Sequence, residues 1–384
     1  MTIQTETPSA NVAAFAAMGA AVAPNAIPGV YNLSPANLLK WRKARSGVIS
    51  GARRAKVACV GDSNTTGYGS VAGGAANCVA SSYPRRLADR LAAGGVAARW
   101  DSAWGTFNES AVNIPIYDTR RVVGAGWAPW GGSAWSLGGP ALLNNTTTNA
   151  YSVTPTGQFD TVDVWVLRNT GLGTVAVDVD GGVATNIALI GGSDIYKTTI
   201  SAGALGTHTV NIRRVSGDCF VVGVDCYNSA APEVAVYNIG WDSGTSGNMA
   251  TATNGYSPLP ALGLIQPDVT ILMNGINDWN ASIAVSTYTT NNQAIITKGK
   301  LTGDVIVMAP IETTGAAAAA AQAPYRTAMR DLAAANGCVF IDMQERFGTY
   351  ATANANGFMA DSSHPMGVAY TDMACLVSRV LMAA

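Results

Sequence analysis

Histidine is the scarcest chemically active residue in this sequence, with only His208 and His364 among 384 residues. Charged residues are also few, at 12% against 48% hydrophobic residues, and the formal net charge is −1. A chain with so much apolar material can build a large core, which excludes global disorder. Basic residues gather only over 42–54 and form no basic stripe, so we expect no nucleic-acid partner.

Long apolar segments are missing as well. No run approaches the ~20 residues that a membrane-spanning helix requires, so we expect no membrane span. The Ala-rich segment 12–24 has no Lys or Arg before it and follows Glu6, which argues against a signal peptide. We therefore expect a cytoplasmic protein by default, and a secreted or virion-associated location stays open.

The cysteines contain no closely spaced pair; they stand at positions 59, 78, 219, 226, 338 and 375. Zinc-binding cysteines are typically separated by about two to four residues, so we expect no metal site. Cys219 and Cys226 fall in one β-like segment at an odd separation. Side chains alternate along a strand, so we expect these two on opposite faces, and we expect all the cysteines to be free thiols.

Short apolar runs that end in turn residues predict buried parallel strands. They lie at 55–62, 234–239, 268–273, 304–309 and 338–342. Helical patterns occur between several of them, most clearly over Tyr83–Ala93 and Pro324–Asn336, where Pro324 suits a first helical turn and Gly337 a C-terminal cap. Strands that alternate with helices predict an α/β fold with a doubly wound parallel sheet. Ligands of such sheets bind beyond the carboxyl ends of the strands.

The middle third of the chain follows a different pattern. Between about 150 and 230, apolar and polar residues alternate, and Gly, Asp and Asn turns interrupt them without a clear helix. This pattern is typical of an antiparallel β-sandwich. We therefore expect an N-terminal arm over 1–45, a discontinuous α/β domain over 46–105 and 233–384, and an inserted β-sandwich domain over 106–232.

Candidate catalytic residues stand at the ends of predicted strands and near the C-terminus. Ser63, in a Gly-Asp-Ser triplet, follows the first strand, and a serine hydroxyl becomes a nucleophile once a neighbouring base takes its proton. His364 is the candidate base, because imidazole titrates near neutrality and His208 lies in a β-like stretch. Asp361, three residues earlier, can accept the imidazole Nδ1–H. Taken singly, the three residues are explained better by a helix-capping serine, a surface or core histidine and a loop or helix-capping aspartate than by catalysis.

Amide groups that could stabilise an oxyanion lie near two further strand ends. Asn277, in Gly-Ile-Asn-Asp, could donate its side-chain amide, and the backbone N–H of Ser63 could donate beside it. Gly244 could supply a third backbone N–H, with Gly247 or Gly240 as alternatives.

These segments together, in this order, resemble the SGNH, or GDSL-type, hydrolase family. The resemblance covers about 55–105 and 233–384, with motifs at Gly61-Asp62-Ser63, 238–244, 275–278 and 361–365. It implies a three-layer α/β/α, flavodoxin-like fold and ester hydrolysis through an acyl-serine intermediate without a cofactor. It also implies that Ser63 is the nucleophile, His364 the base and Asp361 its orienting partner, with Ser63, Gly244 and Asn277 forming the oxyanion hole. The second motif is one residue longer than usual, and Asn64 replaces a more common apolar residue.

The predicted insert is similar to galactose-binding-like β-sandwiches that accompany carbohydrate-active enzymes, through segments 177–182 and 206–212. A purely structural lid or an oligomer contact would explain it equally well. Trp127, Trp130 and Trp135 could stack on sugar rings, although tryptophan is also a common packing residue. Trp241, Trp279 and Asp62 flank the catalytic motifs and are candidate substrate contacts.

The resulting hypothesis is a serine esterase that removes small acyl groups, acetyl first, from carbohydrate or other small esters. An acetylated glycan is then the expected partner, and a homo-oligomer stays open. An arylesterase, a lipase, a thioesterase or an acyltransferase on the same residues is one alternative. A glycan-binding, virion-type structural module with a vestigial site is another, of a different class.

Overall fold

The computed structural model describes residues 27–72, 74–132, 135–314 and 319–383. Within them, the α/β domain contains a seven-stranded sheet that is parallel except for its first edge strand. Its order is β1 (Val30–Tyr31), β20 (Val339–Asp342), β19 (Asp304–Ala309), β18 (Val269–Met273), β2 (Ala55–Gly61), β17 (Val234–Gly240) and β3 (Ala98–Arg99). The five strands predicted from apolar runs are confirmed as β2, β17, β18, β19 and β20, and the mixed α/β class is confirmed with them.

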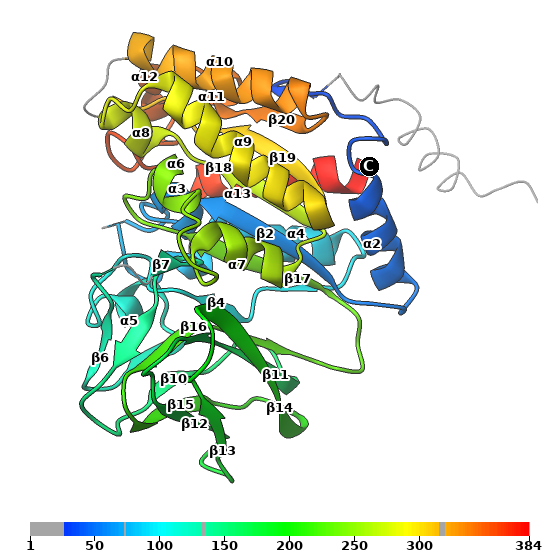
Figure 1. Cartoon of the computed structure of the whole chain (residues 1–384). Helices are drawn as coiled ribbons and strands as arrows, with labels where there is room; N and C mark the ends of the chain where they lie inside the picture. The colour runs from blue at the N-terminus through cyan, green and yellow to red at the C-terminus, as the bar shows by residue number, and fades with distance from the viewer. Residues whose placement is uncertain (1–26, 73, 133–134, 315–318, 384) are drawn as a thin grey trace, which may run out of the picture.

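Helices cover both faces of this sheet (Figure 1). One face packs against α2 (Leu39–Ile49), α4 (Tyr83–Ala93) and α13 (Gly367–Ala383). The other packs against α7 (Pro258–Ile265), α9 (Val285–Thr302) and α10 (Ala319–Ala335). Strand β2 shows why a continuous apolar run is needed, since Cys59 is buried on the first face and Val60 on the second.

The N-terminal arm expected over 1–45 is wrong for the part that the structure describes. Strand β1 pairs antiparallel with β20, and α2 buries Trp41 and Ala44 against the sheet. The indole N–H of Trp41 also donates to the carbonyl of Leu381, 2.8 Å away. Residues from Ile27 onward therefore belong to the α/β domain, whereas residues 1–26 lie outside the described residues.

Helix α10 begins earlier than the sequence pattern predicts. It starts at Ala319 and holds Pro324 in its interior, not in its first turn. The alanines before Pro324 have the highest helix propensity of any residue, so the helix extends through them despite the hydrogen bond that proline cannot make. The predicted helix over Tyr83–Ala93 has the bounds of α4, where Ser82 accepts the N–H of Arg85 as the N-cap.

Between β3 and β17 the chain forms two antiparallel sheets. One contains β13 (Thr185–Ala188), β12 (Thr174–Val179), β15 (Val210–Ser216), β10 (Tyr151–Val153) and β5 (Arg121–Val123). The other contains β14 (Asp194–Gly206), β11 (Phe159–Arg168), β16 (Cys219–Tyr227), β9 (Leu142–Asn144), β6 (Trp127–Pro129) and, beside β16, β4 (Ser102–Trp104). The two sheets share one hydrophobic core. Because β4 already pairs with β16, this unit starts near residue 102, not at the predicted 106.

The two-sheet unit packs directly onto the α/β domain. Trp104 and Trp165 from its six-stranded sheet belong to the same hydrophobic cluster as Tyr237 of β17. The ring of Trp104 meets that of Tyr237 edge-on at 5.2 Å between centroids. Arg99, at the crossing from β3, contributes a buried ion pair with Asp101 and another with Glu233. The Arg99 guanidinium therefore joins the segment by which the chain enters the two-sheet unit to the segment by which it returns to β17.

Cys219 and Cys226 lie on the same side of β16, so the expectation of opposite faces is wrong. Both side chains enter the core between the two antiparallel sheets. A shift in the pairing of β16 with β11, where Trp165 pairs with Gly223 but Val166 with Val221, inserts one residue and resets the alternation. The expectation of free thiols is confirmed for all six cysteines, which lie within the described residues.

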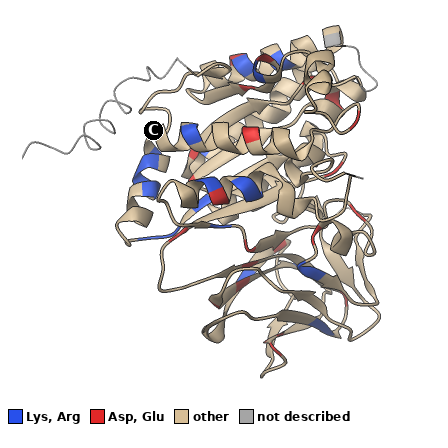
Figure 2. Ribbon diagram, turned by 180° about the vertical axis from the view of Figure 1, so that it is seen from behind, with Lys and Arg blue, Asp and Glu red and all other residues tan. Residues whose placement is uncertain are grey.

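Acidic and basic side chains are interleaved along the helices of the face drawn in Figure 2. Arg85 and Asp89, one turn apart on α4, form one such pair. Within the ranges that the structure describes, no helix has the length and apolar character needed to cross a bilayer.

His208 lies in the short connection between β14 and β15, not within a strand as the alternation suggested. Its Nδ1 is 2.6 Å from Asp180 Oδ2 and its Nε2 is 2.8 Å from the carbonyl of Ala204. Both partners are acceptors, so the ring satisfies both as the doubly protonated imidazolium. The pKa of His208 is raised above its ordinary value, mainly by the hydrogen bond to Asp180 and next by the one to the Ala204 carbonyl.

We therefore predict a pH-dependent contribution of His208 to stability. A raised pKa in the folded state means that the stabilisation is complete below about pH 6.5 and is lost as pH rises through the higher folded-state value. Because the pair is partly exposed, the effect on Tm should be on the order of 1–2 °C. Thermal unfolding from pH 5.5 to 8.5 should show this loss in the wild type and not in His208→Gln; parallel curves for both proteins would contradict the prediction.

Candidate active site

Ser63 lies at the point where the order of the parallel sheet reverses. It follows β2, whose neighbours β17 and β18 continue the chain in opposite directions across the sheet. This is the crevice in which doubly wound sheets bind ligands. Ser63 opens the short helix α3 (Ser63–Thr66), and Asp62 caps it by accepting the N–H of Asn64 at 3.0 Å. Gly61 is required there, since a Cβ would lie 2.1 Å from the carbonyl oxygen of Met273.

The structure brings the three candidate catalytic side chains into one hydrogen-bonded chain. Ser63 Oγ is 2.9 Å from His364 Nε2, and His364 Nδ1 is 2.8 Å from Asp361 Oδ2. The serine and histidine are half-buried, and the aspartate lies at the surface. A base between an alcohol and a carboxylate can take the alcohol proton and be stabilised as the imidazolium.

Asp361 also organises the loop that carries the histidine. Its Oδ1 accepts the backbone N–H groups of Ser363 and His364, both at 2.7 Å. Partial burial opposes ionisation, but these hydrogen bonds and the one to the imidazole outweigh it and lower the pKa of Asp361 below its ordinary value. The carboxylate therefore stays charged across the neutral range.

Asn277 reaches the segment that follows β17. It lies on α8 (Ile276–Asn280), which starts after Gly275 at a φ of 128°. Its Nδ2 donates to the carbonyl of Gly244 at 3.0 Å. An amide nitrogen carries two hydrogens, so this bond orients Asn277 and leaves a second N–H for another acceptor.

The backbone N–H of Gly244, expected as an oxyanion donor, is already engaged: it donates to the carbonyl of Trp241 at 2.8 Å. The N–H of the alternative Gly240 donates to Asn238 Oδ1 at 3.0 Å. Gly247, the third alternative, is the second residue of α6 (Ser246–Met249), where the helix offers no carbonyl partner. Gly244 thus closes a turn with Trp241. What Gly244 contributes to the site is its carbonyl, which accepts the Asn277 amide, and not its N–H.

Asp278, to which the sequence analysis gave no role, also binds the segment around Gly244 through Ser246. Its two carboxylate oxygens accept the N–H of Ser246 at 2.9 Å and the hydroxyl of Ser246 at 2.5 Å. Burial raises the pKa of Asp278. Asn277 and Asp278 thus fix two positions of the 244–246 segment. The sequence feature that could have indicated the role of Asp278 is the Asn-Asp pair directly after a strand.

The three residues expected to contact substrate lie in the interior instead. Trp279 is 3% exposed within the core beside α10, and Trp241 is 5% exposed with its ring against Trp135. Asp62 is fully buried, which raises its pKa to about 7. All three are packing or capping residues, so the expectation of substrate contact is wrong for them.

The two-sheet unit reaches the site through the loop that follows β4. Phe107 accepts the backbone N–H of Asp242 at 3.0 Å through its carbonyl, and Asn108 donates its amide to the carbonyl of Asp242 at 3.3 Å. Of the tryptophans expected to stack on sugars, Trp127 is buried, Trp135 is half-buried and Trp130 is 37% exposed. Trp130 and Trp135 therefore keep accessible surface, and Trp127 does not.

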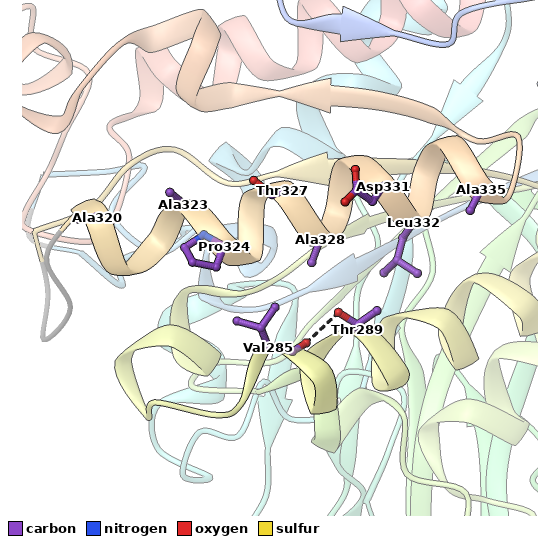
Figure 3. A pocket seen from close by; sticks show the side chains of 10 residues that line it. All are labelled: Val285, Thr289, Ala320, Ala323, Pro324, Thr327, Ala328, Asp331, Leu332 and Ala335. Carbon is purple, nitrogen blue, oxygen red and sulfur yellow. Dashed lines mark hydrogen bonds between the residues drawn. The ribbon is translucent and has the colours of Figure 1, made fainter.

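A surface groove between α9 and α10 lies apart from these residues (Figure 3). Val285 and Thr289 line it from α9, and Pro324 and Leu332 line it from α10. It contains none of the candidate catalytic residues, so its size does not bear on the chemistry of Ser63.

Comparison with known families agrees with the geometry. A model described as the GDSL-like lipase/acylhydrolase family matches residues 215–371. This range includes Asn277, Asp361 and His364. Ser63 lies outside it, before the two-sheet unit in the sequence. A search of curated proteins gives no match.

Among solved structures, a peptidoglycan O-acetylesterase has a TM-score of 0.69 at 15% identity, over 92% of this chain and 99% of its own. A Corynascus thermopiles family two carbohydrate esterase with a carbohydrate-binding domain has a TM-score of 0.29 at 15% identity, over 63% and 95% of the two chains. A Clostridium thermocellum family two carbohydrate esterase has 0.31 at 12%, over 62% and 93%. Only the first likeness bears on the fold, and its coverage extends over the two-sheet unit as well.

We predict that Ser63 reacts with a fluorophosphonate probe and that Asp361→Asn slows this labelling by roughly 10³–10⁴-fold, because the asparagine holds the wrong imidazole tautomer. Mass spectrometry of the labelled peptide would follow the rate. Asp89→Asn on the surface of α4 is the matched control and should label like the wild type. Equal rates for Asp361→Asn and the control would contradict the arrangement.

Proposed function

Since the chain belongs to the GDSL-like lipase/acylhydrolase family, whose SGNH members are carboxylic ester hydrolases, we propose that it removes small acyl groups, acetyl first, from carbohydrate. The observation that carries this proposal is the continuous hydrogen-bonded chain from Ser63 through His364 to Asp361. Its position at the reversal point of the sheet supports the same conclusion.

In the proposed reaction Ser63 Oγ attacks the ester carbonyl while His364 Nε2 takes its proton. The imidazolium that forms is stabilised by Asp361 through Nδ1–H and then protonates the departing alcohol. A water molecule, activated by the same histidine, attacks the acyl-serine and releases the acid. The lowered pKa of Asp361 supports this role, because the carboxylate has to be charged when the imidazolium forms.

The oxyanion would be stabilised by the backbone N–H of Ser63 and the second amide hydrogen of Asn277. The N–H of Ser63 stands in the first turn of α3, where no helix carbonyl is available to accept it. Asn277 is held in place by Gly244, so its amide is oriented before the reaction begins.

The substrate class rests on the likeness to the peptidoglycan O-acetylesterase, which carries an acetyl-removing activity on a glycan by name. We further interpret residues 102–227 as an inserted, galactose-binding-like β-sandwich that binds carbohydrate and flanks a three-layer α/β/α hydrolase domain. The hydrogen bonds of Phe107 and Asn108 with Asp242 support this interpretation, because a carbohydrate bound to this unit would then lie near the proposed acyl site.

We predict serine-dependent turnover of nitrophenyl acetate that falls steeply from acetate to butyrate to octanoate. Ser63→Ala should reduce kcat by about 10⁴–10⁶-fold, leaving the background that binding and the oxyanion hole supply. Release of acetate from acetylated glycans would then be measured for both proteins.

Each outcome of the chain-length series separates one alternative. Rates that rise with chain length would favour lipid or thioester substrates over the proposed acetyl group. Glycan binding without turnover of any ester, unchanged in Ser63→Ala, would replace the enzyme by a binding module. Full activity of Ser63→Ala would refute the assignment of the nucleophile.

A second prediction concerns Asn277. Replacement by alanine removes one oxyanion donor and should lower kcat by roughly 10²–10³-fold with little change in KM, because the contact forms in the transition state. Gly247→Pro provides a comparison, since it removes the backbone N–H of Gly247, the remaining alternative donor of this motif. Its kcat should stay near the wild-type value if Ser63 and Asn277 alone stabilise the oxyanion. Steady-state kinetics on nitrophenyl acetate would measure both.

A further inference from the structure

The face of the His364 imidazole is covered by an aromatic ring that the catalytic scheme does not use. The ring centroids of Tyr68 and His364 are 4.6 Å apart, with an angle of 56° between their planes. Tyr68 is half-buried and stands five residues after Ser63. A cation within about 6 Å of a ring centroid is attracted by the negative face of the ring. The imidazolium formed during acyl transfer would be such a cation.

Backbone hydrogen bonds tie Tyr68 to the nucleophile. Its N–H donates to the carbonyl of Ser63 at 3.1 Å, alongside the N–H of Gly67 at 2.9 Å. Its own carbonyl accepts the hydroxyl of Tyr370 on α13 at 2.8 Å. The ring that covers the histidine is therefore fixed relative to the serine that the histidine must reach.

Two glycines with positive φ create the space for this contact. A Cβ at Gly69, where φ is 83°, would lie 2.7 Å from the Cβ of His364. A Cβ at Gly74, where φ is 93°, would lie 2.8 Å from the hydroxyl of Tyr68. The close approach of His364 to this loop thus depends on glycine at position 69, and the place of the Tyr68 ring depends on glycine at position 74.

Tyr68 also packs against residues of the two-sheet unit. Tyr117 lies 6.0 Å from Tyr68 between ring centroids, stacks on Phe107 at 6.1 Å, and donates its hydroxyl to Glu109 at 3.1 Å. The ring of Tyr68 consequently contacts both the histidine and an aromatic cluster from residues 107–117.

We propose that Tyr68 is a positioning residue for the catalytic base: its ring keeps the imidazole of His364 in line with Ser63 Oγ and stabilises the imidazolium. The inference rests on the proposed function, since it assigns Tyr68 to the same reaction. The hydroxyl of Tyr68 has no part in it, and phenylalanine should serve equally well.

Several titratable groups near Ser63 make kinetics alone ambiguous. Asp361 faces His364 from its own loop, and Tyr350 donates its hydroxyl to the carbonyl of Asp361. Behind the serine, burial raises the pKa of Asp62 and of Asp242 to about 7 each. A pH–rate profile can therefore contain more than one protonation near neutrality, and a probe specific to the histidine ring is needed.

The scarcity of histidine makes such a probe simple. The full chain contains two imidazoles, so the ¹H NMR signals of His364 are identified as those that remain in His208→Gln. In that background Tyr68→Leu should lower the titration midpoint of the remaining ring by roughly half a pH unit. Tyr68→Phe should keep the wild-type midpoint and the ring-current shift of the imidazole protons.

Kinetics on the same variants give the second readout. Tyr68→Leu should lower kcat by roughly 2- to 5-fold with KM unchanged, and Tyr68→Phe should restore the wild-type value. Pentafluorophenylalanine at position 68 keeps the shape of the ring and reverses its quadrupole, so it should lower the titration midpoint as leucine does. Because it preserves packing, it tests the proposal even if Tyr68→Leu impairs folding. An unchanged midpoint with pentafluorophenylalanine, or failure of Tyr68→Phe to restore it, would overturn the proposal.

The NMR titration needs no substrate, so the two possible failures can be told apart. If no ester is turned over but the midpoint shifts as expected, the proposed substrate class fails and the role of Tyr68 stands. If esters are turned over and the midpoint does not move, Tyr68 has a structural role only. Tm of each variant, measured in parallel, identifies a loss of folding.

Discussion

The contact between Ser63 Oγ and His364 Nε2 joins residues 301 positions apart, and most of the architecture determines whether it can form. Strand β2 delivers the serine to the reversal point of the sheet, and the loop before α13 returns the histidine to it. Met359 and Pro365 bridge that loop, and Asp361 closes it through two backbone N–H groups. The geometry is thus fixed mainly by backbone hydrogen bonds, which tolerate little variation in length.

The two-sheet unit is part of this arrangement and not an appendage. Its six-stranded sheet shares a hydrophobic cluster with β17, and Arg99 joins both chain crossings through Asp101 and Glu233. Its loop at Phe107 then contacts Asp242, close to the segment that orients Asn277. A carbohydrate bound to this unit would consequently lie on a part of the molecule that contacts the segment orienting Asn277.

The parts of the molecule that follow from local pattern could be predicted from the sequence. Buried parallel strands need continuous apolar runs, and the chemistry of Ser63, His364 and Asp361 needs those residue types at strand ends and one turn apart. Exposure could not be predicted: Trp279 has the same sequence signal whether it packs in a core or lies in a cleft. The side on which Cys226 lies depends on a bulge set by pairing with β11, which is a long-range interaction. The same holds for the two-residue strand β1 and for α2, because their contacts with the sheet are also long-range.

Two strained backbone positions lie where the two units meet. Phe107 and Ser243 adopt positive φ, at 58° and 60°, although neither residue favours that region. Such conformations cost on the order of 1–3 kcal/mol each and persist only where surrounding contacts impose them. Here the carbonyl of Phe107 accepts the N–H of Asp242, and its N–H donates to the carbonyl of Gly138, so the strained residue is held from both sides. The turn at Gly244 follows directly, and it is this turn that presents the carbonyl orienting Asn277. The carbonyl that orients Asn277, the proposed oxyanion donor, is therefore positioned in part by packing between the two units.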